Sequence, residues 1–279
     1  MRVTQCGELG MFSDGLDGAN GDNKYKYVQA ANPVKSIDLF CGAGGFTEGL
    51  RQAGYQTILA NDSDEMACKT FRHNHPSVPI ICRDVAKVAA DEILDTVRLK
   101  AGEVNLVVGG PPCQGFSLAG RRVADDPRNK MFLDFVRIVE GLQPEIFVFE
   151  NVSGIMTMQK GQALVAIISA FENIGFSCQY RVLNCADYGV PQRRPRFILV
   201  GSRDGRNIGF PAPTHGQIFP QDSLLGTNAQ PHLTSWEALS DLPEITQGQG
   251  FEAMDHCNHY HNDYQKSRRG MRMPGKLFN

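Results

Sequence analysis

The feature that most constrains the fold is a regular alternation of short apolar runs and helical patterns between residues 34 and 203. The strand candidates are Lys35–Phe40, Thr57–Ala60, Pro79–Cys82, Val104–Val108, Glu145–Phe149, Gln179–Leu183 and Arg196–Gly201. The helix candidates are Gly44–Ala53, Asp64–Asn74, Val88–Leu99, Lys130–Gly141 and Ala163–Ile174. This alternation predicts an α/β fold, with a doubly wound, mainly parallel sheet and helices on both faces.

The two flanks of this core have a different character. Residues 1–33 are rich in Gly, Asn, Asp and Ser without sustained periodicity, which predicts a flexible N-terminal arm. After Arg203 periodicity fades, and only Thr234–Leu239 suggests a further short helix. We therefore expect one domain over 34–203 and a loop-rich tail over 204–279 that is not a complete second domain.

Composition narrows the class of protein. Lysine and arginine (28) nearly balance the acidic residues (30), so a polyanionic partner has to be held by local basic clusters. No apolar run approaches the roughly 20 residues of a membrane span, and no secretory signal is evident. Eight cysteines without a CxxC pair predict free thiols in a reducing cytoplasm.

Cys113 occupies the run Gly109–Ser117, directly behind the strand candidate Val104–Val108. Two glycines close that strand and two prolines stiffen the loop, which holds the thiol at the carboxyl end of the strand. Open α/β sheets place their reactive groups at this edge. We therefore interpret Cys113 as a nucleophile.

A glycine-rich turn, Asp38–Phe46, joins the first strand to the first helix, where backbone can approach a ligand closely. Thr47 stands where a full dinucleotide fingerprint has its third glycine, so a plain tight turn is an alternative. Asp62 and Asp84 follow the next two strands, where carboxylates can bind a ribose and an adenine amino group. Each can instead cap a helix. Together the three positions favour an adenosine-containing cofactor.

Two polar segments follow later in the chain. Glu150 closes the fifth strand candidate, where partial desolvation would raise its pKa and let it donate a proton near neutral pH. Gln192, Arg194 and Arg196 share one face if their segment is extended, and arginine forks suit phosphate or a heterocycle carbonyl oxygen. The alternatives are a surface glutamate that caps a turn and a solvated basic edge.

The sequence contains two further polar clusters, a basic loop and a histidine-rich run. Arg121, Arg122, Arg128 and Lys130 lie in a polar loop that either closes over a polyanion or is merely exposed. The run His256–His261 matches no closed zinc pattern, so we expect no metal site.

In order and spacing, five segments resemble the cytosine-5 DNA methyltransferase family: Asp38–Phe46, Gly109–Ser117, Phe149–Val152, Asp187–Pro191 and Gln192–Arg196. The resemblance covers about 34–203, and Pro-Pro-Cys-Gln with Glu-Asn-Val is far more specific than the glycine turn. It implies a Rossmann-like methyltransferase sheet. It also implies methyl transfer from S-adenosylmethionine, without a metal, to C5 of a cytosine flipped out of double-stranded DNA.

The resemblance assigns roles residue by residue. Cys113 would add to cytosine C6, Glu150 would hold and protonate N3, and Arg194 would contact O2. The further substrate-binding residues implied are Gln114, Ser117, Asn151, Gln192 and Arg196. The cofactor-binding residues implied are Asp38, Phe40, Gly42, Gly44, Asp62, Asp84 and Pro111.

The chain departs from the family's pattern after Arg203. Pro211–His215 and Trp236–Pro243 are similar to the run-in to the target-recognition region, but the later motifs do not occur before Asn279. We therefore expect residues 204–279 to be the incomplete start of that region, and the chain to be a truncation or a catalytic subunit completed by a second polypeptide.

The expected role is that of a cytoplasmic, nucleoid-associated modification enzyme of a restriction–modification system, with no membrane partner. Two alternatives stay within the fold: a transfer-RNA cytosine-5 methyltransferase, and a non-catalytic DNA-binding homologue that is inactive without a partner. A nicotinamide oxidoreductase is the weakest alternative, because it leaves Pro-Pro-Cys-Gln and Glu-Asn-Val without a role.

Overall fold

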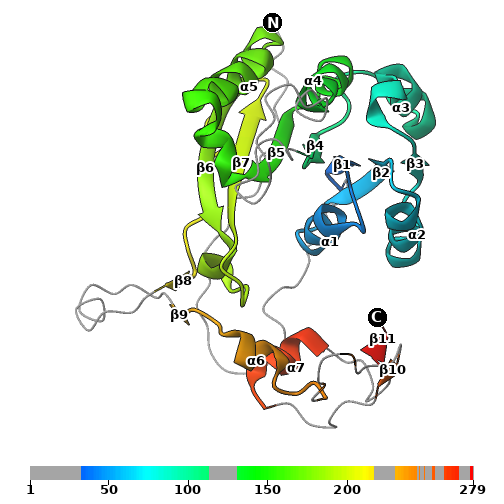
Figure 1. The fold of residues 1–279 in the computed structure, drawn as a ribbon. Coiled ribbons are helices and arrows are strands. Elements are labelled where there is room, and N and C mark those ends of the chain that lie inside the picture. The colour runs from blue at the N-terminus through cyan, green and yellow to red at the C-terminus, as the bar shows by residue number, and fades with distance from the viewer. Residues whose placement is uncertain are drawn as a thin grey trace, which may run out of the picture.

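The computed structural model describes residues 33–112, 131–216, 230–243, 245, 248, 253–254, 261–269 and 277–278. Within these residues a seven-stranded sheet has the order β3-β2-β1-β4-β5-β7-β6 (Figure 1). The strands are β1 Lys35–Leu39, β2 Gln56–Asp62, β3 Ile80–Cys82, β4 Leu106–Gly109, β5 Ile146–Val152, β6 Ser177–Asn184 and β7 Pro195–Ser202. The pairs from β3 to β5 are parallel, whereas β7 is antiparallel to both its neighbours. The predicted mainly parallel sheet is confirmed.

Helices cover both faces of the sheet, as predicted. They are α1 Gly45–Gln52, α2 Glu65–Asn74, α3 Ala90–Val97, α4 Met131–Leu142 and α5 Gln162–Asn173. Figure 1 shows α1 and α2 on one side of the sheet and α3, α4 and α5 on the other. The chain builds outward from β1 to β3 and then returns to β4, and right-handed crossovers place the two helix groups on opposite faces. This reversal between β1 and β4 creates the switch point where open sheets bind ligands.

The larger hydrophobic core lies between the sheet and the helices α4 and α5. Phe147 of β5 stacks on Phe171 of α5 with ring centroids 4.0 Å apart, and Phe135 of α4 meets both rings edge-on. All three side chains are fully buried, and each contributes about 2–3 kcal/mol of transfer free energy. This packing fixes β5, the strand that carries Glu150.

Two local features differ from the prediction. β5 was expected to end at Phe149, but its antiparallel pairing with β7 continues through Glu150, Asn151 and Val152. A short 3-10 helix, η1 Val85–Lys87, lies between β3 and α3, and the Asp84 side chain caps it. Three residues are too few to show a helical period in sequence. Further 3-10 turns are η4 Ser153–Met156, η5 Met158–Gly161 and η6 Cys185–Tyr188.

The tail contains small elements. The expected helix is present as α6 Ser235–Leu239, and Thr234 with Glu237 forms a capping box at its start. Helix α7, Asp263–Arg269, was not predicted because its sequence has no apolar face. The short strands are β8 His215–Gly216, β9 Gln230–Pro231, β10 Ala253–Met254 and β11 Leu277–Phe278. The predicted arm lies outside the described residues except for Pro33, and none of the helices described is long and apolar enough to cross a membrane.

Candidate active site

The register of the sheet aligns three predicted site residues, together with Gly110, at its carboxyl edge. Leu39 pairs with Asn61 and with Gly109, and Gly109 pairs with Phe149. The residue that follows each of these positions is therefore level with its neighbours. In the order of the strands β2, β1, β4 and β5, these residues form the row Asp62, Phe40, Gly110 and Glu150. Three strand spacings of ~4.8 Å separate the ends of this row, roughly 14 Å.

A cavity of about 240 Å³ is lined by three residues of this row, Phe40, Asp62 and Gly110. Its lining residues are Phe40, Asn61, Asp62, Ser63, Asp84, Val85, Gly110, Pro112 and Met131. The structure thus brings together Phe40, Asp62 and Asp84 from the predicted cofactor set. Six lining residues were not predicted as site residues: Asn61, Ser63, Val85, Gly110, Pro112 and Met131. The available signals were that Asn61 and Ser63 flank Asp62 at a strand end and that Gly110 and Pro112 lie in the run Gly109–Ser117.

The turn after β1 is shaped by its backbone and by Asp62. Phe40 has φ 57° and Gly42 has φ 55°, both in the left-handed region, where a non-glycine residue stores strain that is often found at functional sites. The Gly42 N–H donates to Asp62 Oδ2 at 2.8 Å, and the Asp64 N–H donates to Oδ1 at 2.9 Å. Each oxygen of Asp62 keeps a lone pair for a ligand hydroxyl.

Asp38 and Gly44 do not line the cavity. Asp38 is completely buried, and its Oδ2 accepts hydrogen bonds from Thr47 N at 3.1 Å and Thr47 Oγ1 at 2.7 Å. Burial raises the pKa of Asp38 to about 7, against the lowering effect of these two bonds. Gly44 lies against His75 and borders a separate cavity of about 650 Å³ between α1 and the end of α2. Asp38 and Gly44 therefore lie outside the cavity, and their contacts with Thr47 and His75 hold the glycine-rich turn in place.

Glu150 faces a cation from the neighbouring strand. Arg196 Nε lies 2.6 Å from Glu150 Oε1, and the two side chains are only 19% and 27% exposed. Burial raises the pKa of Glu150, while the charges of Arg196 and Arg194 act in the opposite direction. The effect of burial is the larger one, so the pKa of Glu150 lies above its ordinary value although the side chain pairs with an arginine. Glu150 therefore holds a proton more readily than an exposed glutamate does.

Contacts also join β5 to the start of the loop after β4, the segment that precedes Cys113 in the sequence. Asn151 Nδ2 donates to the Pro111 carbonyl oxygen at 3.1 Å. A β-carbon at Gly110 would stand 2.8 Å from Glu150 Oε2, so the carboxylate packs on bare backbone there. Cys113, Gln114 and Ser117 lie outside the described residues, as does the basic loop from Arg121 to Lys130. Pro112, the last described residue before this stretch, lines the cavity.

This arrangement agrees with a comparison to known families. The model for the C-5 cytosine-specific DNA methylases matches residues 34–275. The chain belongs to this family.

Similar members of the methylase family are type II methyltransferases. M.AquIA of Picosynechococcus is 42% identical over 223 residues, which span 76% of this chain and 90% of that protein. M.AgeI of Thalassovita gelatinovora is 37% identical, and the match spans 85% of this chain and 58% of the relative. M.DdeI of Desulfomicrobium norvegicum is 40% identical, with spans of 84% and 54%. The chain therefore spans little more than half of the latter two relatives.

Solved structures show the same methylase fold. One is described as a DNA modification methyltransferase encoded within an Escherichia coli prophage. It has a TM-score of 0.61 and 28% identity, and the match covers 76% of this chain and 56% of that one. A DNMT2 from Spodoptera frugiperda has a TM-score of 0.52 at 23% identity, covering 76% and 60%, which supports the fold alone.

The side chains that line the cavity suit the chemistry of S-adenosylmethionine, the cofactor of the methylase family. The Phe40 ring offers an aromatic face, Asp62 and Asp84 offer carboxylates, and Val85 and Pro112 add apolar wall. No group of three or more His, Cys, Asp or Glu that could hold a metal occurs in the part of the chain that the structure describes. Of the run His256–His261, only His261 falls within that part.

The arginine-rich segment of the methylase is only partly extended. β7 begins at Pro195, so Gln192 and Arg194 precede the strand and are exposed. The Arg194 N–H donates to Asn184 Oδ1 at 3.0 Å. Arg196, opposite Val152 in the ladder, is the one of the three whose side chain pairs with Glu150.

Proposed function

We propose that this chain carries the catalytic centre of a DNA cytosine-5 methyltransferase, the cytoplasmic modification enzyme of a restriction–modification system. The observation that carries the proposal is the position of Gly110 and Pro112, which lie just before Cys113 in the sequence, between Glu150 and the cavity. Pro112, the preceding residue, lines the cavity with Phe40 and Asp62, and Gly110 contacts Glu150. A base held beside Glu150 would therefore lie next to the segment that leads into Cys113 and next to the cofactor cavity.

The described residues support separate roles in binding the cofactor and in holding the loops around it. S-Adenosylmethionine supplies the methyl group when bound. Phe40 would stack on its adenine, Asp62 would accept from its ribose hydroxyls, and Asp84 would accept from its amino group. Asp38, Gly42 and Gly44 would hold the turn that carries Phe40, and Pro111 would hold the loop through its bond to Asn151.

The chemistry on the base then follows from Cys113 and Glu150. The Cys113 thiolate forms a bond to C6 of the flipped cytosine, and Glu150 delivers a proton to N3 as the ring's π electrons shift. The raised pKa of Glu150 supports this role, because the carboxyl has to hold a proton until attack. C5 becomes nucleophilic and takes the methyl group. A base then removes the C5 proton, the C5–C6 double bond forms again as the Cys113 sulfur leaves, and N3 returns its proton to Glu150.

The arginines and the polar loop residues would hold the base. Arg196 and Arg194 place positive charge beside Glu150, where the cytosine O2 would lie, and Gln192 precedes them. Gln114 and Ser117 follow Cys113 in the same loop and would contact the substrate. These assignments stand on the resemblance and on the position of Glu150.

A mechanism-based trap tests the proposal. A DNA duplex with 5-fluorocytosine, incubated with S-adenosylmethionine, should yield a covalent adduct at Cys113, because fluorine cannot leave C5 as a proton. Cys113→Ser should abolish the adduct, and an unchanged yield would identify another nucleophile. A transfer RNA with the same modified base is the parallel substrate. Adduct on RNA alone would replace DNA as the substrate, and no adduct on either would contradict catalysis.

We also propose that a second polypeptide contributes to target recognition. Support comes from the relatives, since the match spans 58% of M.AgeI and 54% of M.DdeI. The trap should give more adduct, at one sequence context, when the product of the adjacent reading frame is added. Full yield and full sequence selectivity from this chain alone would contradict this part of the proposal.

A further inference from the structure

The segment from β3 to α3, which carries Asp84 to the cavity, is bound to the sheet on one side only. β3 has only three residues, lies at the sheet edge and pairs on one side with β2. The following turn η1 has three residues and is capped by Asp84 itself, whose Oδ1 accepts from Ala86 N at 3.0 Å. The position of Asp84 therefore depends on contacts from outside the segment.

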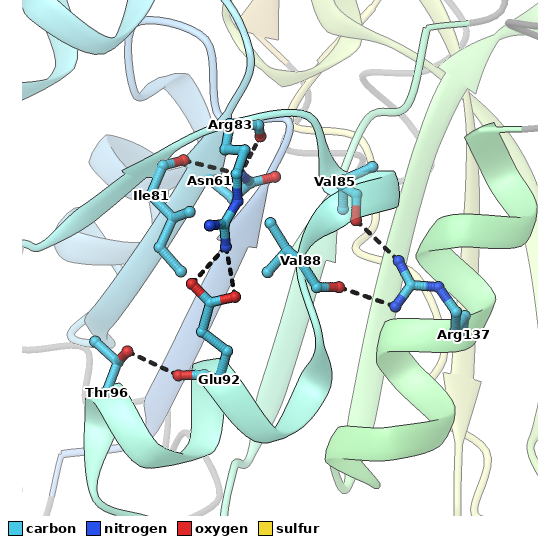
Figure 2. Close-up of polar contacts among 8 residues, drawn as sticks. All are labelled: Asn61, Ile81, Arg83, Val85, Val88, Glu92, Thr96 and Arg137. Carbon is cyan, nitrogen blue, oxygen red and sulfur yellow. Dashed lines mark hydrogen bonds and ion pairs between the residues drawn. The ribbon is translucent and has the colours of Figure 1, made fainter.

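One such contact comes from α4 (Figure 2). Arg137 Nη1 donates to the Val88 carbonyl oxygen at 2.9 Å, and Arg137 Nη2 donates to the Val85 carbonyl oxygen at 2.8 Å. Asp134, one turn earlier on the same helix, lies 3.2 Å from Nη2 and orients the guanidinium. Both ends of the η1 turn are thus fixed to α4 by one planar fork, a geometry that lysine cannot reproduce.

The second contact comes from β2, on the other side of Asp84. Asn61 is 1% exposed, and its Nδ2 donates to the carbonyl oxygens of Ile81 and Arg83, both at 2.8 Å. The Arg83 side chain in turn pairs with Glu92 of α3. Figure 2 shows these contacts and the Arg137 fork approaching the same stretch of chain from two directions.

We infer that Arg137 and Asn61 are positioning residues that set cofactor specificity at the purine end of the cavity. They hold the backbone on both sides of Asp84, so its carboxylate stands where an exocyclic amino group can donate to it. The inference rests on the proposed function, because it assigns the Asp84 side of the cavity to an adenine ring. Neither residue touches the reacting atoms.

The matching experiment measures discrimination between two ligands by calorimetry. S-Adenosylhomocysteine has the 6-amino group, and S-inosylhomocysteine has a carbonyl oxygen that Asp84 would repel. The wild-type chain should prefer the adenosyl compound by at least about 10-fold. Arg137→Lys should weaken adenosyl binding by about 10-fold while changing inosyl binding by less than about 3-fold, so that the preference collapses.

Arg51→Lys is the control. Arg51 also makes a two-pronged contact, to Glu48 at 2.8 Å through each nitrogen, but on the exposed surface of α1. It should leave the preference unchanged. If Arg137→Lys does not fold, Arg137→Gln retains one amide donor and should give an intermediate loss of preference.

The outcomes distinguish a failure of the proposed function from a failure of the positioning role. A wild-type chain that binds neither ligand would contradict the proposed function itself. A wild-type chain that discriminates, together with an Arg137→Lys chain of equal preference, would overturn the positioning role. Equal weakening of both ligands in Arg137→Lys would also overturn it, since that is the result of a general structural defect.

Discussion

Replacement of Asp38 by asparagine should remove a large part of the pH dependence of stability. The carboxyl is fully buried behind the glycine turn, and burial raises its pKa from 3.8 to about 7. Between these two values the native chain holds a proton that the unfolded chain has lost. Stability therefore falls as pH rises through this window, and the loss is complete above it.

The magnitude follows from the two pKa values. Each pH unit between them costs the native state about 1.4 kcal/mol, which gives about 4 kcal/mol over the whole window. Between pH 5 and pH 8, the titration of Asp38 lowers the free energy of unfolding by about 3 kcal/mol. Asp38→Asn keeps the shape of the side chain, and its oxygen still accepts from Thr47. The variant should thus lose about 3 kcal/mol less than the wild type over this range.

Urea unfolding followed by far-ultraviolet circular dichroism at pH 5, 6, 7 and 8 measures the effect. Thr47→Val tests the cause, because the Thr47 hydroxyl donates to Asp38 and lowers its pKa. Without this hydrogen bond the pKa of Asp38 should be higher, so the pH range over which stability falls should extend to higher pH. Free energies of unfolding that change in parallel for wild type and Asp38→Asn would refute the reasoning.

Three further outcomes follow from the geometry. Gly44→Ala should cost about 2–4 kcal/mol in urea titrations, because its β-carbon would stand 2.3 Å from His75 Nε2. Gly54→Ala has a similar positive φ with open space and should cost about 1 kcal/mol, so equal losses would exclude the clash. Glu150→Gln should slow single-turnover methylation by about 10²–10⁴-fold, and an unchanged rate would remove Glu150 from the chemistry. Arg196→Met should raise the Glu150 pKa further, as measured by carboxyl ¹³C NMR, since the guanidinium lowers it; a fall would reverse that assignment.

Much of the fold was predictable because it depends on local patterns. The apolar runs and the glycines that end them located every strand of the main sheet within about two residues at most ends. The extension of β5 past Phe149 was not predictable from its own residues. Glu150 and Asn151 have low strand preference. They are extended because they pair with residues of β7 that lie 45 or more positions later in the sequence.

The candidate site was predictable in part for a related reason. Strand ends and glycines mark Phe40, Asp62 and Asp84, because the fold class fixes which sheet edge carries ligands. The sequence did not reveal that Arg137 contacts Val85 and Val88, since a helix surface arginine has no local sign of its partner. Nor did it show which arginine of the 192–196 segment meets Glu150, a choice that depends on where β7 begins.

The Glu150–Arg196 pair is set by the register of one antiparallel ladder. Glu150 lies opposite Ile198, and Arg196 lies opposite Val152, two residues away on the same face. A slip of one residue in β7 would turn the guanidinium to the other face of the sheet. A single insertion or deletion within Pro195–Ser202 would therefore separate the pair in one step. Changes of chain length before or after that strand leave the register of the Glu150–Arg196 pair intact.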